Sequence, residues 1–140
     1  MRQFVIYLEN RLGVLLDLTR TLGHNGIHIC GISIVDTADA AVVRVVVDDP
    51  DRCRQTLAEH DIPSTENPIL VVRMVKGPQQ LENVLRALVE AEVNLNYLYS
   101  LMIYQNGHTH VALHCEDPGY ARFVIEKAGL EVLTQADLSR

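Results

Sequence analysis

A short segment near the start of the chain, Asn10-Arg11-Leu12-Gly13, has residue types suited to holding a small charged ligand. It lies between Phe4–Leu8, an apolar run typical of a strand, and Val14–His24, where apolar residues recur at helical spacing. A helix N-terminus offers unpaired N–H groups and the positive end of the helix dipole, which suit a carboxylate. Glycine lets the backbone approach a ligand closely, and an asparagine amide both donates and accepts hydrogen bonds, as a zwitterion requires. Simple turn formation is the alternative, because asparagine and glycine also favour loops for backbone reasons.

The same layout occurs a second time, where Val72–Leu81 again runs from a strand through a turn into a helix. In this copy Lys76 replaces the asparagine, Gln79 replaces the glycine, and Pro78 lacks an N–H that could meet a carboxylate. An internal repeat of this size indicates two copies of one structural unit. The residue changes predict one intact ligand site per chain and one degenerate site.

Each copy is expected to contain the elements βαββαβ. In the first copy these are strand Phe4–Leu8, helix Val14–His24, strands Ile27–Val35 and Ala41–Val47, a helix from Pro50 to about His60, and strand Ile62–Glu66. In the second they are strand Ile69–Val75, helix Pro78–Glu92, strand Val93–Tyr104, turn Gln105–Gly107, strand His108–Cys115, a helix from Pro118 to Ala128, and strand Leu130–Thr134. Asp-Pro pairs begin the second helix of each copy, and Asn25-Gly26 ends the first helix.

The predicted fold class is therefore α+β, with two tandem ferredoxin-like domains at residues 1–67 and 68–140. Each domain should have an antiparallel sheet with both helices on one face. The linker Glu66–Pro68 is too short for free domain motion. Val42–Val47 and Tyr97–Tyr104 barely alternate apolar with polar residues, so the second sheet face is expected to be buried too, by packing between the copies and in an oligomer.

The whole composition is ordinary for a soluble globular protein, with 48% hydrophobic and 21% charged residues in 140. The net charge of −6 and the scattered basic residues argue against nucleic-acid binding. No apolar run approaches the ~20 residues of a membrane span. Three widely spaced cysteines without a CxxC motif favour a reduced, cytoplasmic protein.

The sequence lacks the residues that other functions of a βαββαβ fold require. An RNA-binding module needs exposed aromatic residues on its central strands, and the first copy has none there. A copper carrier needs a CxxC in its first loop, and an acyl phosphatase needs a different turn around Asn10 and Arg11. Nothing groups Ser, His and Asp, or Cys and His, on one loop cluster, so no catalysis is predicted.

Three histidines share one face of a predicted strand, at His108, His110 and His114. Such a cluster could bind zinc, copper or nickel. However, Cys115 falls on the opposite face, and His110 and His114 lie ~13 Å apart along a strand. A solvated or interface strand face is the preferred interpretation, and no metal site is predicted.

These residues together resemble the ACT domain, a small regulatory module that binds amino acids. The resemblance rests on Asn10–Leu15, on Asn25–Ile29 at the entry to the second strand, on the Asp-Pro helix starts, and on the Asn-x-x-Tyr-x-Tyr pattern of Asn94–Tyr99. The resemblance covers the whole chain as two tandem copies, and it is strongest to the stand-alone tandem ACT proteins of bacteria. Residues that match the family's pattern are then expected to form the site.

By this resemblance, the ligand lies between the loop of one copy and the helix-to-strand junction of the other. The expected ligand-binding residues are Asn10, Arg11, Leu12, Gly13, Val14 and Leu15 with Val93, Asn94, Leu95 and Asn96. The degenerate second site would combine Lys76 and Gln79 with His28 and Ile29.

The predicted function is a cytoplasmic, non-catalytic regulator that binds an amino acid at the interface of its two domains, with a small or aliphatic ligand favoured. No cofactor is expected, and the partners would be a second copy of the chain and possibly an enzyme. Two alternatives remain open. One is an accessory subunit that docks an enzyme through its apolar sheet face, and the other is a metal sensor.

Overall fold

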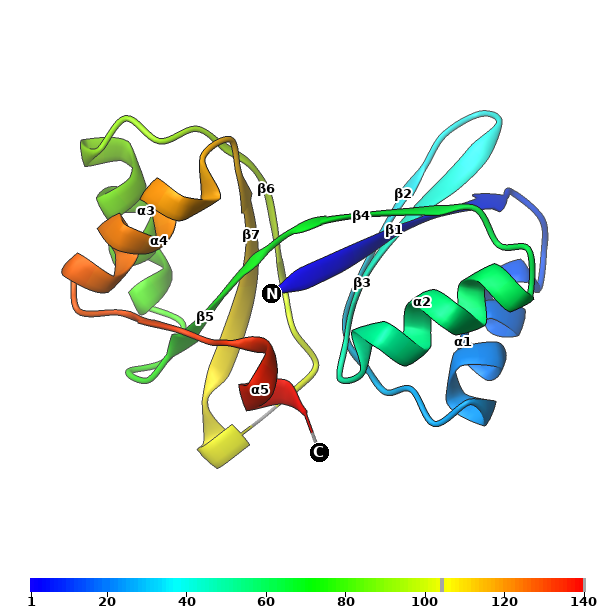
Figure 1. Ribbon diagram of the computed structural model, residues 1–140. Coiled ribbons are helices and arrows are strands. Elements are labelled where there is room, and N and C mark those ends of the chain that lie inside the picture. Colours follow the sequence, from blue (N-terminus) through cyan, green and yellow to red (C-terminus); the bar gives the residue numbers. More distant parts are fainter. Residues whose placement is uncertain (104, 140) are drawn as a thin grey trace. The chain divides into compact units, whose positions relative to one another are not determined.

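A computed structural model describes residues 1–103 and 105–139 of the chain (Figure 1). The chain divides into two compact units. Domain 1 consists of Arg2–Asn67 together with Leu138 and Ser139, and domain 2 consists of Pro68–Asp137 together with Met1.

Domain 1 has a four-stranded sheet in the order β2-β3-β1-β4. Its elements are β1 (Arg2–Glu9), α1 (Val14–His24), β2 (Ile29–Asp36), β3 (Ala40–Val47), α2 (Pro50–Glu59) and β4 (Ser64–Pro68). The central strand β3 pairs antiparallel with both β1 and β2. The predicted βαββαβ order is confirmed for this copy.

Domain 2 repeats this topology, with the sheet order β6-β7-β5-β8. Its elements are β5 (Leu70–Met74), α3 (Gln80–Glu90), β6 (Leu95–Ser100), the 3₁₀ turn η1 (Gln105–Gly107), β7 (Thr109–Cys115), α4 (Pro118–Lys127), β8 (Glu131–Val132) and a short helix α5 (Gln135–Leu138). Strand β7 pairs antiparallel with β5 and β6, as β3 does with β1 and β2. The ferredoxin-like fold class is therefore confirmed in both copies.

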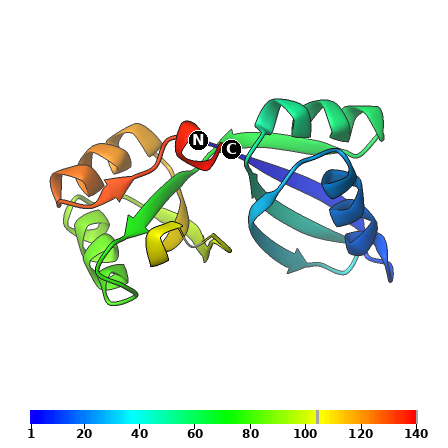
Figure 2. The same cartoon turned by 90° about the horizontal axis from the view of Figure 1, so that it is seen from below.

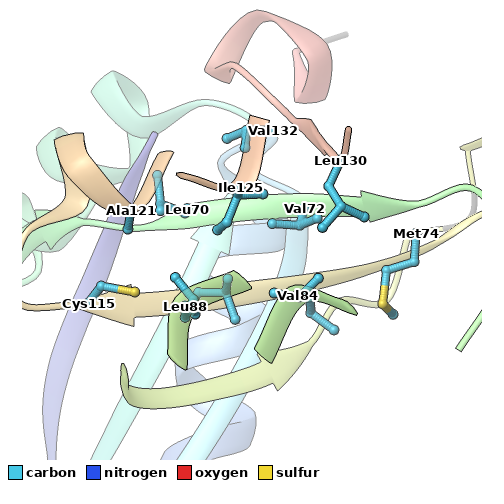
Figure 3. Close-up of a cluster of buried hydrophobic side chains, with 12 residues drawn as sticks. Leu70, Val72, Met74, Val84, Leu88, Cys115, Ala121, Ile125, Leu130 and Val132 are labelled. Atoms are coloured by element: carbon cyan, nitrogen blue, oxygen red, sulfur yellow. The ribbon is translucent and has the colours of Figure 1, made fainter. Parts of the chain in front are cut away.

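Each domain buries one face of its sheet under its own two helices (Figures 1 and 2). In domain 1 the core comprises Phe4, Ile6, Leu18, Leu22, Ile27, Val43, Val45, Val47, Cys53 and Leu57. In domain 2 alternate residues of β5 point toward Val84 and Leu88 of α3 and toward Ile125 of α4 (Figure 3). Since successive strand residues point to opposite faces, this alternation sets which side chains lie beneath the helices.

Two helices begin as the Asp-Pro pairs predict. Asp49 accepts a hydrogen bond from the Arg52 N–H at 3.1 Å, and Asp117 accepts one from the Tyr120 N–H at 3.1 Å. In both helices proline occupies the first turn, where its missing N–H costs nothing. Each aspartate thereby satisfies one N–H group that the helix itself cannot.

All four long helices end through a left-handed residue. These residues are Gly26 (φ 73°), Asp61 (φ 53°), Glu92 (φ 56°) and Gly129 (φ 86°). After α3, for example, the Val93 N–H donates to the Leu88 carbonyl at 2.9 Å, which closes the helix and turns the chain back toward the sheet. Glutamate has no local preference for this conformation, so Glu92 is held there by the fold.

Some predicted boundaries differ from the observed ones. The expected linker Glu66–Pro68 lies within β4, so only Ile69 separates β4 from β5. The expected strand Val93–Tyr104 forms regular structure only over β6, and Tyr104 lies outside the described residues. Burial along β6 alternates at every residue, contrary to expectation, because this edge strand covers the core with one face only. Helix α5 was not predicted, and β8 is shorter than the predicted strand. Among the described residues, no helix is long and apolar enough to cross a membrane.

The left-handed conformation of Glu92 generates a stability prediction. Glu92→Gly should raise the free energy of unfolding by about 1 kcal/mol, because glycine adopts a positive φ without the cost of a Cβ. Glu90→Gly, two residues earlier inside α3, should instead lower it by about 1 kcal/mol. Urea denaturation followed by circular dichroism measures both. Equal destabilisation by the two substitutions would contradict this account of the helix end.

Candidate functional site

The loop between β1 and α1 is built around one glycine. The Arg11 N–H donates to the Glu9 carbonyl at 2.8 Å, which turns the chain as it leaves β1. Gly13 then adopts a φ of 86° at the N-cap of α1, and it provides no side-chain hydrogen bond to the helix. The first turn of α1 therefore lacks the side-chain cap that Asp49 and Asp117 give to α2 and α4.

A pocket of about 170 Å³ lies beside this loop, between the end of the sheet and the first turn of α1. Its apolar walls come from three strands and the helix: Leu8, Val14, Leu15, Ile34, Ala41 and Val43. Four polar residues complete its lining: Glu9, Asn10, Arg11 and Asp36. All of these residues belong to domain 1. The pocket thus combines a hydrocarbon interior with a charged rim.

The rim carries both signs of charge. The Arg11 guanidinium Nε lies 2.5 Å from Glu9 Oε2, and both side chains are well exposed. Asp36, at the end of β2, adds a second carboxylate. A ligand carboxylate could pair with Arg11 and the Asn10 amide, while a ligand ammonium could pair with Glu9 or Asp36.

The structure brings together most, but not all, of the predicted loop residues. Asn10, Arg11, Val14 and Leu15 line the pocket. Leu12 does not, since its side chain is completely exposed (105%). Gly13 shapes the loop without lining the pocket.

In the equivalent loop of domain 2, side chains of the loop and of the following helix form hydrogen bonds with the loop backbone. The Gln80 side chain accepts a hydrogen bond from the Lys76 N–H at 2.8 Å, and Gln79 Nε2 donates to the Lys76 carbonyl. The left-handed glycine is Gly77 (φ 95°), two residues before the helix N-cap, whereas Gln79 at the N-cap has ordinary helical angles. The two loops therefore differ in backbone conformation as well as in residue type.

Larger buried side chains stand in domain 2 where the pocket lies in domain 1. Met74 pairs with Thr109 across the sheet as Leu8 pairs with Ala41, and Met74 is only 4% exposed. Gln80 begins α3 as Val14 begins α1, and it is also buried. These substitutions supply a physical reason for a degenerate second site.

The predicted residues at the helix-to-strand junctions have partners within their own domains. The Asn94 amide donates to Glu116 Oε2 at 3.1 Å, and Asn96 Oδ1 lies 3.0 Å from His114 Nδ1. Val93 and Leu95 pack against the domain 2 core. None of these four residues lines the domain 1 pocket, so their contribution to a ligand site remains a prediction.

The corresponding junction of domain 1 has a similar carboxylate contact. Buried Asp48 accepts a hydrogen bond from the His28 N–H at 2.8 Å, and its other oxygen lies 3.0 Å from His28 Nδ1. Ile29 packs against the core. Asp48 and Glu116 thus hold the same turn in the two copies. The helix-to-strand junctions of both domains therefore have a structural role.

The histidine cluster is not a solvated face at its centre. His110 is only 1% exposed; Arg73 Nε donates to its Nε2 at 3.3 Å, and its Nδ1 lies 3.4 Å from the Ile103 carbonyl. This pattern fits a neutral ring with the proton on Nδ1, and burial lowers the pKa of His110. His114 stacks on Tyr97 with ring centroids 4.8 Å apart. In the part of the chain that the structure describes, no three His, Cys, Asp or Glu side chains form a metal-binding group.

Two of the three cysteines lie in the hydrophobic core clusters of the domains. Cys53, in α2, and Cys115, at the end of β7, are buried in the cores of domains 1 and 2, respectively. Burial, reinforced by the nearby Glu66 carboxylate, raises the pKa of Cys53 to about 12. A thiol with that pKa stays protonated at neutral pH and makes a poor nucleophile.

Comparison with known proteins decides the family. A model described as an ACT domain pair matches residues 1–140. The chain belongs to the ACT domain pair family. ACT domains are regulatory modules, so the resemblance found in the sequence is confirmed. The comparison with curated proteins returned no match.

Several solved structures share the fold of this ACT pair. A Bacteroides thetaiotaomicron protein is 24% identical, with a TM-score of 0.89 over 99% of this chain and 95% of that chain. The regulatory subunit of aspartate kinase from Thermus thermophilus, in its ligand-free form, is 15% identical, with a TM-score of 0.63 over 91% of each chain. The aspartate kinase of Clostridium acetobutylicum is 16% identical, with a TM-score of 0.54, over 91% of this chain and 32% of that one. At these identities the similarity shows the fold.

Six of the ten residues that line the pocket were not predicted from the sequence. Glu9 and Asp36 on the rim, and Ile34 and Ala41 in the wall, come from strands and carry no motif. One signal was present, because the turn between β2 and β3 aligns Asp36 with Ala41 across the hairpin. Reading that register would have placed both residues at the end of the sheet nearest the Asn10 loop.

Two glycines of α1 provide a test of the loop conformation. Neither Gly13 nor Gly23 has an atom within 4 Å of where a Cβ would lie, so they differ in backbone conformation and not in space. Gly13→Ala should lower the free energy of unfolding by about 1–2 kcal/mol, because it forces alanine into a left-handed conformation. Gly23→Ala, within the helix, should raise it by about 1 kcal/mol. Chemical denaturation of the two variants should show opposite signs, and a stabilising Gly13→Ala would refute the assigned backbone.

Proposed function

We propose that this ACT pair is a non-catalytic regulatory protein that binds a free amino acid with a small aliphatic side chain at the domain 1 pocket. The observation that carries the proposal is the pocket beside Asn10–Gly13, with its apolar walls and its rim of mixed charge. A zwitterion with a hydrocarbon side chain matches both parts of this lining. The role of domain 2 residues Val93–Asn96 in completing the site, expected from the family resemblance, is part of the same proposal.

Each group of the ligand has a partner of complementary chemistry. Its carboxylate would bind Arg11, the Asn10 amide and the uncapped first turn of α1, where the helix dipole favours negative charge. Its ammonium would bind Asp36 and the Glu9 carboxylate. Arg11 and Glu9 already pair with each other, so a zwitterion replaces one ion pair by two.

Ligand binding would exert its regulatory effect through helix α1. The ligand would join the start of this helix to the ends of β1, β2 and β3, and could thereby change the affinity for a partner by about 1–3 kcal/mol. We propose that the partner is an enzyme or a second copy of the chain in the cytoplasm. The occurrence of the same fold in the regulatory subunit of an aspartate kinase supports a role of this kind.

Calorimetric titration with the standard amino acids tests the proposal directly. Aliphatic amino acids should bind, and Gly13→Val should abolish binding, because a β-branched residue cannot hold a φ of 86°. Gln79→Val, at the equivalent position of domain 2, should change the affinity little. Absence of binding by every amino acid would refute the ligand assignment, and equal losses in both variants would refute a single site in domain 1.

A second binding experiment isolates the ammonium contact. Asp36→Asn should weaken leucine binding by about two- to fivefold, as loss of an exposed ion pair does. It should leave the affinity for 4-methylpentanoate, which lacks the ammonium group, unchanged. Asp39→Asn, in the adjacent turn, is the matched control and should affect neither ligand. If Asp36→Asn weakens both ligands equally, the carboxylate does not bind the ammonium.

A further inference from the structure

The floor of the domain 1 pocket is formed by side chains of neighbouring strands, and one of them is much smaller than the rest. Ala41 lies in β3, the strand between β1 and β2, and pairs with Leu8 on one side and Asp36 on the other. It shares a sheet face with Val43, two residues along, which also lines the pocket. The Ala41 methyl group therefore stands between an apolar wall residue and a charged rim residue.

We infer that Ala41 determines the size of the ligand side chain, and that the pocket selects hydrocarbon side chains of three or four carbons over smaller and over acidic ones. This inference rests on the proposed function, since it assumes that an amino acid binds here. It adds a specificity determinant in a strand, outside the loop and junction residues that the family resemblance indicates.

The volume supports a side chain of this size. An apolar cavity of about 150 Å³ is known to hold benzene, with six carbons. The domain 1 pocket has about 170 Å³ and is open on one side. On this scale the four side-chain carbons of leucine or isoleucine fill more than half of that space and the three of valine somewhat less than half, whereas alanine leaves most of it to water.

The lining disfavours acidic and amide side chains. The interior residues around Ala41 are aliphatic, so a buried carboxylate or amide would lose its hydration without finding a hydrogen-bond partner. An acidic side chain would in addition meet the two carboxylates of the rim, Glu9 and Asp36. A neutral hydrocarbon is the chemistry that remains.

Domain 2 provides an internal comparison. The residue equivalent to Ala41 is Thr109, which pairs with Met74 as Ala41 pairs with Leu8. Thr109 and Met74 are each longer than their counterparts, and Met74 is buried in the core. The smaller residue is therefore found in domain 1, where it lines the pocket beside the Asn10 loop.

The test compares affinities along a series of ligands, using the full chain and isothermal calorimetry. Glycine, alanine, valine and leucine differ only in the number of side-chain carbons, and each enclosed methylene should increase the affinity by about fourfold. Ala41→Leu and the milder Ala41→Val fill the pocket progressively. Ala40→Leu makes the same change at the next residue, which points to the opposite face of the sheet.

The wild-type chain should bind leucine and valine at least tenfold more tightly than alanine and glycine. Ala41→Leu should sharply reduce this preference, with leucine weakened by about twentyfold or more and glycine changed by no more than about threefold. Ala41→Val should weaken leucine to a lesser extent, and Ala40→Leu should behave as wild type. Retained binding of glycine also shows that each variant is folded.

Two results would overturn the inference while leaving the proposed function intact. One is a wild-type affinity that does not depend on side-chain length. The other is an Ala41→Leu variant in which all four ligands are affected equally, or none is. By contrast, a wild-type chain that binds no amino acid would overturn the proposed function itself, and this inference with it.

Discussion

The backbone of Gly13 is the constraint on which the arrangement of domain 1 depends. At a φ of 86° it lets the chain leave β1, turn once and enter α1 directly. Helix α1 can then place Leu18 and Leu22 against the sheet, where both are buried. A residue with a Cβ would resist this conformation, so the turn depends on glycine at this one position. Because glycine has no side chain, the helix begins without a side-chain cap, and the Val14 N–H donates instead to the Arg11 carbonyl at 3.4 Å.

The two copies show which features of this unit tolerate change. Their cores and strand order agree, because residues beneath the helices must pack against two layers at once. The loop between the first strand and the first helix of each copy is less constrained, since its backbone hydrogen bonds can be made in more than one way. Domain 2 uses Gly77 and the Gln80 side chain for this purpose, and a methionine fills the space beneath. Its loop is therefore well suited to stability and poorly suited to a ligand.

Much of the fold was readable from local signals. Helix α1 has the predicted bounds, Val14–His24, because Gly13 precedes it and Asn25-Gly26 ends it. The Asp-Pro starts of α2 and α4 are confirmed by the hydrogen bonds of their capping carboxylates. These signals are local because each depends on contacts within one turn of the chain.

The parts that escaped prediction depend on contacts between distant segments. Ile34 and Ala41 enter the pocket wall only through the register of three strands, which no single segment specifies. The buried state of His110 depends on Arg73 in a neighbouring strand. Glu92 adopts a left-handed conformation that its residue type does not suggest. In each case the surrounding fold overrides or supplies what the local sequence lacks.

The location of the pocket gives a physical reason why occupancy would have consequences beyond the ligand itself. The segment from Leu12 to Leu16 has an uncapped helix start and largely exposed side chains, including Leu16 at 52%. Such a segment belongs to the less stable part of a domain, where local opening requires little free energy. A ligand that contacts both this segment and the strand ends stabilises the closed form in proportion to the logarithm of its concentration. A ligand shifts the balance between the closed and the locally opened form only if it binds the two forms with different affinity. Here that difference would come from the strand ends, because a ligand held by the opened helix start could not contact them. A pocket shared by an exposed helix start and the ends of a sheet would thus convert ligand concentration into local order.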